Sequence, residues 1–283
     1  MATSDYQVRN FSKARQASID LLRLSEHKHT IHGLIEVDVT EARRFIRDYE
    51  ARTGEQASFT AFIIACLGKA VDQDKMVQAV RSGRKKLIVF NDVDVNTMIE
   101  RAVPDGEKIV RVYVVRAANR KSYWEINREI WQAQSQPQQT LIPVWAQRYG
   151  DLMLSIPWSL RRLIWKFMLS NPHNWRKWGG TVALTAVGMF GEGGGWGIPI
   201  VPNTLTVTLG GIAEKPGIVD GRIETREYLN VTLSFDHDII DGAPGARFAA
   251  RLKALIESGY GLMTDSPAAS VPTTAQGSPV VSG

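Results

Sequence analysis

The sequence predicts an α/β domain, and three observations support this fold class. Segments in which apolar and polar residues alternate, as in half-buried strands, occur in both halves of the chain. Amphipathic segments with apolar residues at helical spacing lie between them. The 283 residues can bury a large core, and 44% are hydrophobic while 22% are charged. This composition excludes a disordered chain, a collagen and a small disulfide scaffold.

The N-terminal half begins its predicted structure with a strand at residues 33–40. Thr40 is expected to cap a helix that ends at Gly54, and Ser58 is expected to cap a second helix. Three short strands and a helix then follow, expected at residues 85–90, 92–99, 109–115 and 121–134.

The C-terminal half is predicted to hold three further strands, at residues 181–187, 204–212 and 229–235. The last of these alternates apolar and polar residues over its whole length. A final helix is expected to begin near Pro244 and to stop at Gly259.

The chain is predicted to form one domain, residues 1–263, with an insertion at 132–178 and a disordered Ser-, Thr- and Pro-rich tail at 264–283. The only cysteine, Cys66, lies in an apolar run, where it is expected to be buried, and it excludes an intrachain disulfide. The N-terminus has no apolar signal segment, and the longest uncharged stretch, 193–213, is too rich in Gly and Pro for a spanning helix. A cytoplasmic location follows as the expectation.

The segment after the last strand contains the most distinctive candidate chemistry. If the alternation of the strand continues, His237 has the same parity as Phe235 and its imidazole points toward the interior. A buried neutral imidazole could act as a general base near neutral pH. Asp241 and Gly242 are expected to form a tight turn into the final helix. A histidine before a turn is equally compatible with a purely structural role.

The motif DHDIIDG, residues 236–242, has the His-x-x-x-Asp-Gly pattern of the chloramphenicol acetyltransferase-like superfamily. Its context resembles more closely the catalytic domain of the 2-oxo acid dehydrogenase acyltransferases, the E2 components. Residues 179–191 and 210–223 resemble further family segments, and residues 35–45 and 103–126 match less tightly. In total, the resemblance covers roughly residues 10–131 and 179–260.

This resemblance implies a chloramphenicol acetyltransferase-like fold, a two-layer α/β sandwich whose mixed sheet is flanked by helices, and a homotrimer that could build a larger cage. It also implies acyl transfer with coenzyme A or acyl-CoA as substrate and with no metal. In the family, the motif histidine is a general base on a thiol, and this position is His237. A hydroxyl that donates to the oxyanion corresponds to Thr185. The family's active site lies at the trimer interface, where two subunits contribute these two groups.

The resemblance further implies that Asp241, followed by Gly242, supports the site through an ion pair with an arginine near the N-terminus, for which Arg15 is the candidate. Two positions depart from the family pattern. Ala186 stands where many relatives have Asn, and Asp238 replaces the common Arg after the histidine. The sequence also shows no lipoyl domain. The alternative is therefore an E2-derived scaffold, or membrane-associated assembly protein, whose chemistry is vestigial.

Two weaker patterns suggest no additional chemistry. The histidines of HKHTIH, residues 27–32, cannot converge on a metal ion without a bend in the strand. The glycine-dense segment 191–197 lacks the Lys-Ser/Thr of a phosphate loop and is interpreted as a flexible loop at the mouth of a channel.

The net charge of +5 is located in the insertion, because residues 141–178 carry six cationic residues and one acidic residue. Within it, residues 157–170 predict an amphipathic helix. Its apolar face is expected to hold Leu160, Leu163, Ile164, Phe167 and Met168. Three interpretations stay open: an oligomer contact, the lining of an acyl or CoA channel, and a peripheral membrane surface. Nucleic-acid binding is not expected.

Overall fold

The computed structural model describes residues 6–8, 11, 13–25, 28–102, 108–135, 155–187, 193–200 and 202–262. The predicted tail at 264–283 and the segment 136–154 of the predicted insertion lie outside these residues.

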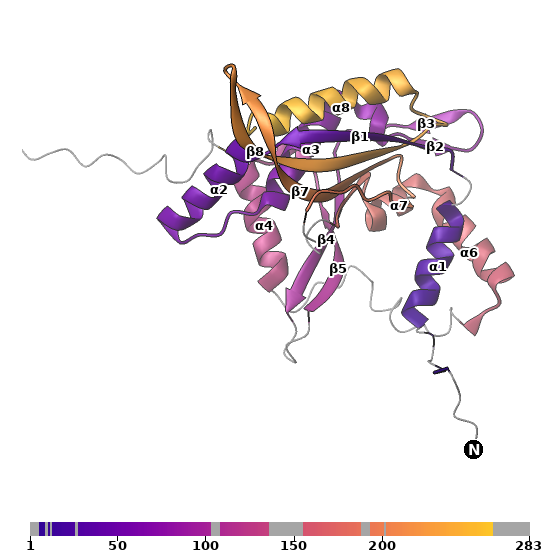
Figure 1. The fold of residues 1–283 in the computed structure, drawn as a ribbon. Helices are drawn as coiled ribbons and strands as arrows, with labels where there is room; N and C mark the ends of the chain where they lie inside the picture. The colour runs from indigo at the N-terminus through magenta and orange to yellow at the C-terminus, as the bar shows by residue number, and fades with distance from the viewer. Residues whose placement is uncertain are drawn as a thin grey trace, which may run out of the picture.

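A mixed six-stranded sheet forms the centre of the molecule, in the order β1-β8-β7-β6-β4-β5 (Figure 1). Its parallel pairs are β4 with β6 and β6 with β7, and its other pairs are antiparallel. A separate hairpin joins β2 and β3. The strands are β1 (Thr30–Asp38), β2 (Val80–Ser82), β3 (Lys86–Ile88), β4 (Val95–Ala102), β5 (Lys108–Val115), β6 (Val182–Ala186), β7 (Leu205–Val219) and β8 (Arg222–Asp236).

The helices of the described residues form two groups. Four cover one face of the sheet: α2 (Thr40–Thr53), α3 (Phe59–Gln73), α4 (Tyr123–Ser135) and α8 (Gly242–Glu257). The others are α1 (Lys13–Ser25), α6 (Trp158–Ser170), α7 (Pro172–Gly179) and the short 3-10 helices η1 (Lys75–Gln78) and η2 (Ala118–Arg120). This arrangement confirms the predicted two-layer α/β fold.

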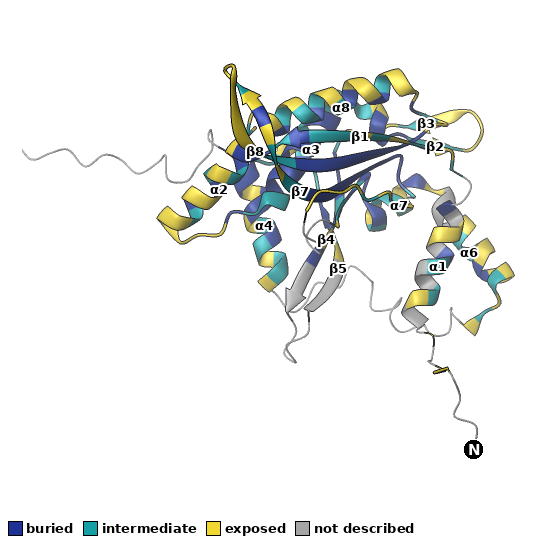
Figure 2. Cartoon of the chain, viewed as in Figure 1, coloured by how far each residue is buried: buried dark blue, intermediate teal, exposed yellow. Residues whose placement is uncertain are grey.

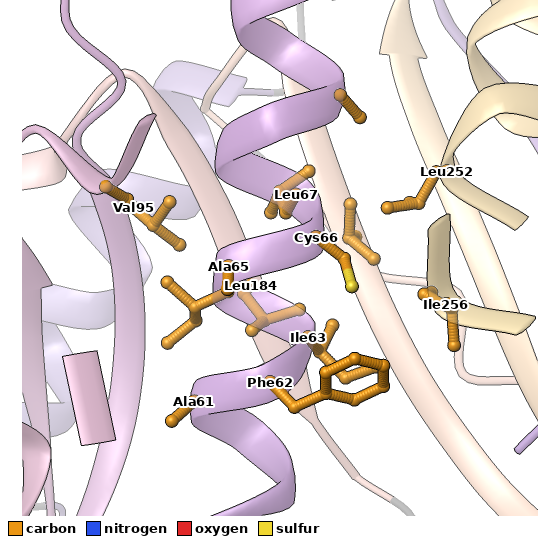
Figure 3. Packing of buried hydrophobic residues seen from close by; sticks show 14 of the residues in the cluster. Ala61, Phe62, Ile63, Ala65, Cys66, Leu67, Val95, Leu184, Leu252 and Ile256 are labelled. Carbon is orange, nitrogen blue, oxygen red and sulfur yellow. The ribbon is translucent and has the colours of Figure 1, made fainter. Parts of the chain in front are cut away.

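The hydrophobic core lies between the sheet and α3 and α8. Because successive side chains of a strand point to opposite faces, Leu184, Val207 and Leu233 all point toward the helices. Figure 3 shows α3 at the centre, with Cys66 facing the side of α8 that carries Leu252. The prediction that Cys66 is buried is confirmed, and burial raises the pKa of its thiol.

Several predicted boundaries shift. β7 extends seven residues beyond its predicted end, to Val219, and β8 begins seven residues before its predicted start, at Arg222. The prediction that Thr40 caps a helix is wrong, because α2 begins at Thr40 and its N-cap is Val39. The Thr40 hydroxyl instead donates to the Asp38 carboxylate over 2.6 Å and accepts from the backbone N–H of Glu227. Ser58 does cap α3 by accepting from the backbone N–H of Ala61.

The helix α6 is attached to α1 by a buried ion pair. The Asp20 carboxylate accepts from Nε and Nη2 of Arg161 over 2.7 and 3.1 Å, and its side chain is 0% exposed. The Arg23 guanidinium lies 4.9 Å from the centroid of the Trp158 ring. These contacts hold the two helices side by side, apart from the four core helices (Figure 1).

We predict that Asp20→Asn releases α6 from α1, because it removes the carboxylate to which Nε and Nη2 of Arg161 donate. Such a loss costs about 3–5 kcal/mol. Hydrogen exchange measured by mass spectrometry should therefore accelerate strongly over residues 158–170, while α3 stays protected. Asp48→Asn, at an exposed site on α2, is the matched control. Unchanged exchange over α6 would contradict the role given to this ion pair.

Candidate active site

The turn after β8 holds the histidine motif between two neighbouring strands. β8 ends at Asp236. The backbone N–H of Asp236 donates to the carbonyl oxygen of Thr204 over 2.9 Å. The next N–H, that of His237, donates to the carbonyl oxygen of His29 over 2.7 Å. The predicted turn into the final helix is confirmed, and the helix begins at Gly242, two residues before Pro244.

The imidazole of His237 lies at the surface of the single chain. Its side chain is 44% exposed, and its Nδ1 lies 3.7 Å from a carboxylate oxygen of Asp241. The prediction that His237 points into the interior is wrong for this chain, because the strand alternation ends at Asp236 and His237 begins the turn. The resulting arrangement is an accessible imidazole beside a carboxylate.

The charge reversal at Asp238 is balanced by residues from other elements. The Asp238 carboxylate lies 2.9 Å from Nδ1 of His29 and 3.6 Å from a guanidinium nitrogen of Arg81. The hydrogen bond with His29 lowers the pKa of Asp238. The Asp238 carboxylate is therefore held by two basic side chains, those of His29 and Arg81.

A cavity of about 290 Å³ lies beside this turn. Asp236 and Asp238, which flank His237, both line this cavity. Their cationic partners, Lys28 and Arg81, line it as well. The Asp236 carboxylate accepts from Nζ of Lys28 over 2.8 Å. The remaining lining residues come from β2, α7, the segments before β6 and β7, and the turn after β8: Val80, Trp175, Thr181, Pro202, Asn203, Thr204 and Ile239. Sequence reasoning missed Lys28, Arg81 and Trp175, because no local pattern links them to the motif.

Thr185, the candidate oxyanion donor, lies on the face of the sheet that the core helices leave uncovered. It is paired with Thr208 on β7, which is paired with Thr232 on β8. His237 is five positions after Thr232, which is about 17 Å along the strand at about 3.4 Å per residue. Two strand spacings of about 4.8 Å separate β6 from β8 across the sheet. One chain therefore does not bring Thr185 and His237 to the same reacting atom.

The segment 193–200 lies across β7 on this uncovered face. The N–H of Gly211 donates to the carbonyl oxygen of Gly195 over 3.0 Å. A Cβ at Gly210 would lie 2.0 Å from the same oxygen, so this close approach requires glycine. The described part of the predicted flexible loop is thus packed on the sheet.

Beneath and beside this segment lies a row of buried polar side chains. The hydroxyl groups of Thr206, Thr208 and Thr232 have no hydrogen-bond partner among the described residues. Buried polar groups are nearly always hydrogen-bonded, so these hydroxyl groups are an exception. Each of the three residues is at most 1% exposed, so none of them reaches the surface of the chain.

The two supporting residues expected for the site have different positions. Asp241 is next to His237, but its side chain is 83% exposed. Arg15 lies on an exposed position of α1, and its pairing with Asp241 stays a prediction. In the described chain, the Asp241 carboxylate has His237 as its ion-pair partner.

The end of the insertion is attached to β4 by a second cluster of charges. The Asp94 carboxylate accepts from Nε of Arg176 over 2.7 Å, from Nη1 of Arg116 over 3.0 Å and from the backbone N–H of Ala117. Burial alone would raise the pKa of Asp94, but these hydrogen bonds outweigh burial and hold the pKa below 3.8. Arg176 thereby anchors α7, and with it Trp175, beside the cavity.

We predict that Asp94→Asn lowers the free energy of unfolding at neutral pH by about 3 kcal/mol, because Arg116 and Arg176 lose the buried Asp94 carboxylate. Arg176 keeps the Asp92 carboxylate at 3.6 Å. Because the folded-state pKa of Asp94 is lowered, its contribution is present above pH 3.8 and is lost as pH falls through and below this value. The variant should therefore lose less stability than the wild type between about pH 5 and pH 2. Urea unfolding over this range tests the prediction, with Asp220→Asn at an exposed turn as control. Equal acid sensitivity of wild type and Asp94→Asn would contradict it.

The fold and the motif turn define an α/β acyltransferase core. Residues 3–143 and 174–264 match the family model of the 2-oxoacid dehydrogenases acyltransferase (catalytic domain). The chain belongs to this family. Residues 144–173, which include α6, lie outside the match.

Individual relatives agree with this family. The chain is 25% identical over 230 residues to the lipoamide acyltransferase component of the branched-chain alpha-keto acid dehydrogenase complex of Bacillus subtilis (strain 168). This alignment covers 80% of the chain and 46% of the relative. A shorter match, 33% identical over 89 residues, is to the human mitochondrial dihydrolipoyllysine-residue succinyltransferase component of the 2-oxoglutarate dehydrogenase complex. It covers 31% of the chain and 19% of that protein.

Solved structures share the fold. A probable dihydrolipoamide acetyltransferase from Listeria monocytogenes 4b F2365 superposes with a TM-score of 0.65 at 23% identity, covering 90% of this chain and 96% of that chain. The cubic core of a pyruvate dehydrogenase multienzyme complex gives a TM-score of 0.62 at 16% identity, covering 93% and 98%. The fold expected from the sequence resemblance is therefore confirmed.

Proposed function

We propose that this protein transfers an acyl group between coenzyme A and an acceptor thiol, hydroxyl or amine, with His237 as the general base. Family membership supports acyl transfer. The accessible imidazole at the motif position, with Asp241 at 3.7 Å, supports the choice of base. Because the chain spans less than half the length of its Bacillus relative, that protein's lipoamide partner is not transferred to this chain.

The proposed reaction starts when His237 takes the proton of the acceptor thiol. The sulfur forms a bond to the carbonyl carbon of the acyl-CoA thioester, and the carbonyl oxygen becomes an oxyanion. The Thr185 hydroxyl donates to this oxyanion. When the intermediate collapses, the bond from carbon to the sulfur of coenzyme A breaks, and the imidazolium of His237 returns its proton to that sulfur. General base catalysis contributes about 10²–10⁴-fold, and one aimed oxyanion donor contributes roughly 3 kcal/mol.

The distance between Thr185 and His237 within one chain is the main observation in favour of a site shared between subunits. Both groups must lie within hydrogen-bond distance of the reacting atoms, about 3 Å. A gap of at least about 17 Å along the sheet is far too long. We therefore propose that Thr185 of one subunit meets His237 of its neighbour. The family resemblance supports a homotrimer as the active unit.

The uncovered face of the sheet also has the apolar surface that such a trimer needs. Large hydrophobic side chains, each more than 40% exposed, lie on this face or on the segment that crosses it: Leu34, Met98, Val112, Val187, Trp196, Ile198 and Ile200. Exposed apolar patches of this kind mark association surfaces. The similarity of the fold to a cubic core supports the further proposal that these trimers assemble into a larger cage.

The decisive experiment mixes two inactive variants. His237→Ala and Thr185→Val should each lose at least about a hundredfold in acyl transfer from acetyl-CoA to a small dithiol. When the two variants are unfolded together and refolded in equal amounts, about a quarter of wild-type activity should return, because one interface in about four then contains both intact residues.

The control is each variant refolded alone, which should stay inactive and trimeric by light scattering. Failure of the mixture to recover activity would exclude the shared site. A wild-type trimer with no turnover on any acyl-CoA would instead support the alternative, a vestigial scaffold. The residues Ala186 and Asp238 motivate that alternative, although Asp238 has compensating partners in His29 and Arg81.

A further inference from the structure

The helix α6 is oriented in an unusual way, since it buries a charged residue and exposes apolar ones. Arg161 is 6% exposed, whereas Leu160, Leu163 and Phe167 are 51%, 62% and 80% exposed. Figure 2 shows the exposed side of α6 at one end of the molecule. The sequence predicted an apolar face here, and these three of its residues point toward solvent. The hydrophobic effect favours the opposite orientation, so this surface is suited to an apolar environment outside the chain.

Basic residues border the apolar ridge formed by Leu160, Leu163 and Phe167. By helical geometry, Arg162 and Lys166 lie along one edge of the exposed face and the ridge lies along the other. Both cationic side chains are exposed, and the segment Trp158–Ser170 contains no acidic residue. On α1, Arg23 is also exposed and adds a cation beside Trp158.

The ion pair between Asp20 and Arg161 explains why this face is presented outward. It fixes the rotation of α6 about its axis, because Nε and Nη2 of Arg161 both donate to the carboxylate. Because the folded chain already holds α6 as a helix, binding of the ridge to a partner does not include the entropic cost of forming that helix.

We propose that the exposed face of α6 docks this protein on an anionic lipid surface. An amphipathic helix with aliphatic and aromatic residues beside Arg and Lys is the arrangement that binds the boundary between headgroups and acyl chains. The ridge would enter this boundary, while Arg162, Lys166 and Arg23 would contact the anionic headgroups. None of the described helices is long and apolar enough to cross a membrane, so the helix would lie in the plane of the surface.

Two other occupants fit the same residues less well. In a symmetric contact between two copies of α6, Arg162 and Lys166 would approach their own counterparts, and like charges repel. An acyl chain in transit would have to enter a cavity. The cavity beside His237 is lined by Trp175 of α7 but by no residue of α6.

Flotation of the full chain with lipid vesicles tests this proposal. The protein should float with vesicles of phosphatidylcholine and phosphatidylglycerol, and much less with phosphatidylcholine alone. Because each Lys or Arg near an anionic surface contributes about fivefold to partition, Arg162→Gln with Lys166→Gln should remove most of this difference. Leu160→Ser with Leu163→Ser should reduce binding to the anionic vesicles by about tenfold or more.

A matched control replaces two equally exposed apolar residues far from α6. Ile218 and Ile223 are paired near the end of the β7–β8 hairpin and are 80% and 78% exposed. Ile218→Ser with Ile223→Ser should bind vesicles like the wild type. All variants change exposed side chains, and circular dichroism checks that they fold.

Three outcomes would overturn the proposal. The first is a wild-type chain that floats with neither vesicle. The second is a leucine variant that binds as tightly as the wild type. The third is a leucine variant that changes the mass of the assembly in solution while vesicle binding is absent, which would identify the ridge as a protein contact. Acyl transfer to a small dithiol should be unaffected by the leucine variant, so failure here leaves the proposed function separately testable.

Discussion

The rest of this structure depends on the one-sided covering of a six-stranded sheet. Because α2, α3, α4 and α8 bury one face, strand alternation must place every second residue on the other face. Thr185, Thr208 and Thr232 lie there as a consequence. The sheet also fixes where the histidine appears. β8 has to end before α8 can turn back over the core, and the turn between them carries His237.

Charge pairs attach the insertion to α1 and to the residue before β4. Asp20 fixes α6 through Arg161, and Asp94 fixes α7 through Arg176. Removing two charges from water offsets much of their attraction, so such pairs determine orientation more than they add stability. They neutralise two of the insertion's six cationic residues and leave others on the surface. Composition alone could not show where the net positive charge of the chain lies. In the structure, Arg162 and Lys166 of the insertion are exposed beside the apolar ridge of α6.

Local patterns in the sequence predicted the elements well and their ends less well. The strands around Leu229 and Val95 and the helix capped by Ser58 follow directly from periodicity and capping. Thr40 was misassigned because its hydroxyl has better partners in Asp38 and in the N–H of Glu227, which belongs to another strand. The interior position predicted for His237 is wrong because the alternation of β8 ends at its last residue, Asp236. Local patterns do not show where tertiary packing ends a strand.

The sequence by itself determined the fold class, the family resemblance and the residues that could carry the chemistry, because periodicity and short motifs are local properties of a chain. Only the tertiary structure decided how these residues are arranged. The contacts of Asp238 with His29 and of Arg161 with Asp20 join residues 209 and 141 positions apart. Such pairings depend on how whole elements pack, and no local pattern encodes them. The same packing separates Thr185 from His237 and turns the leucines of α6 outward.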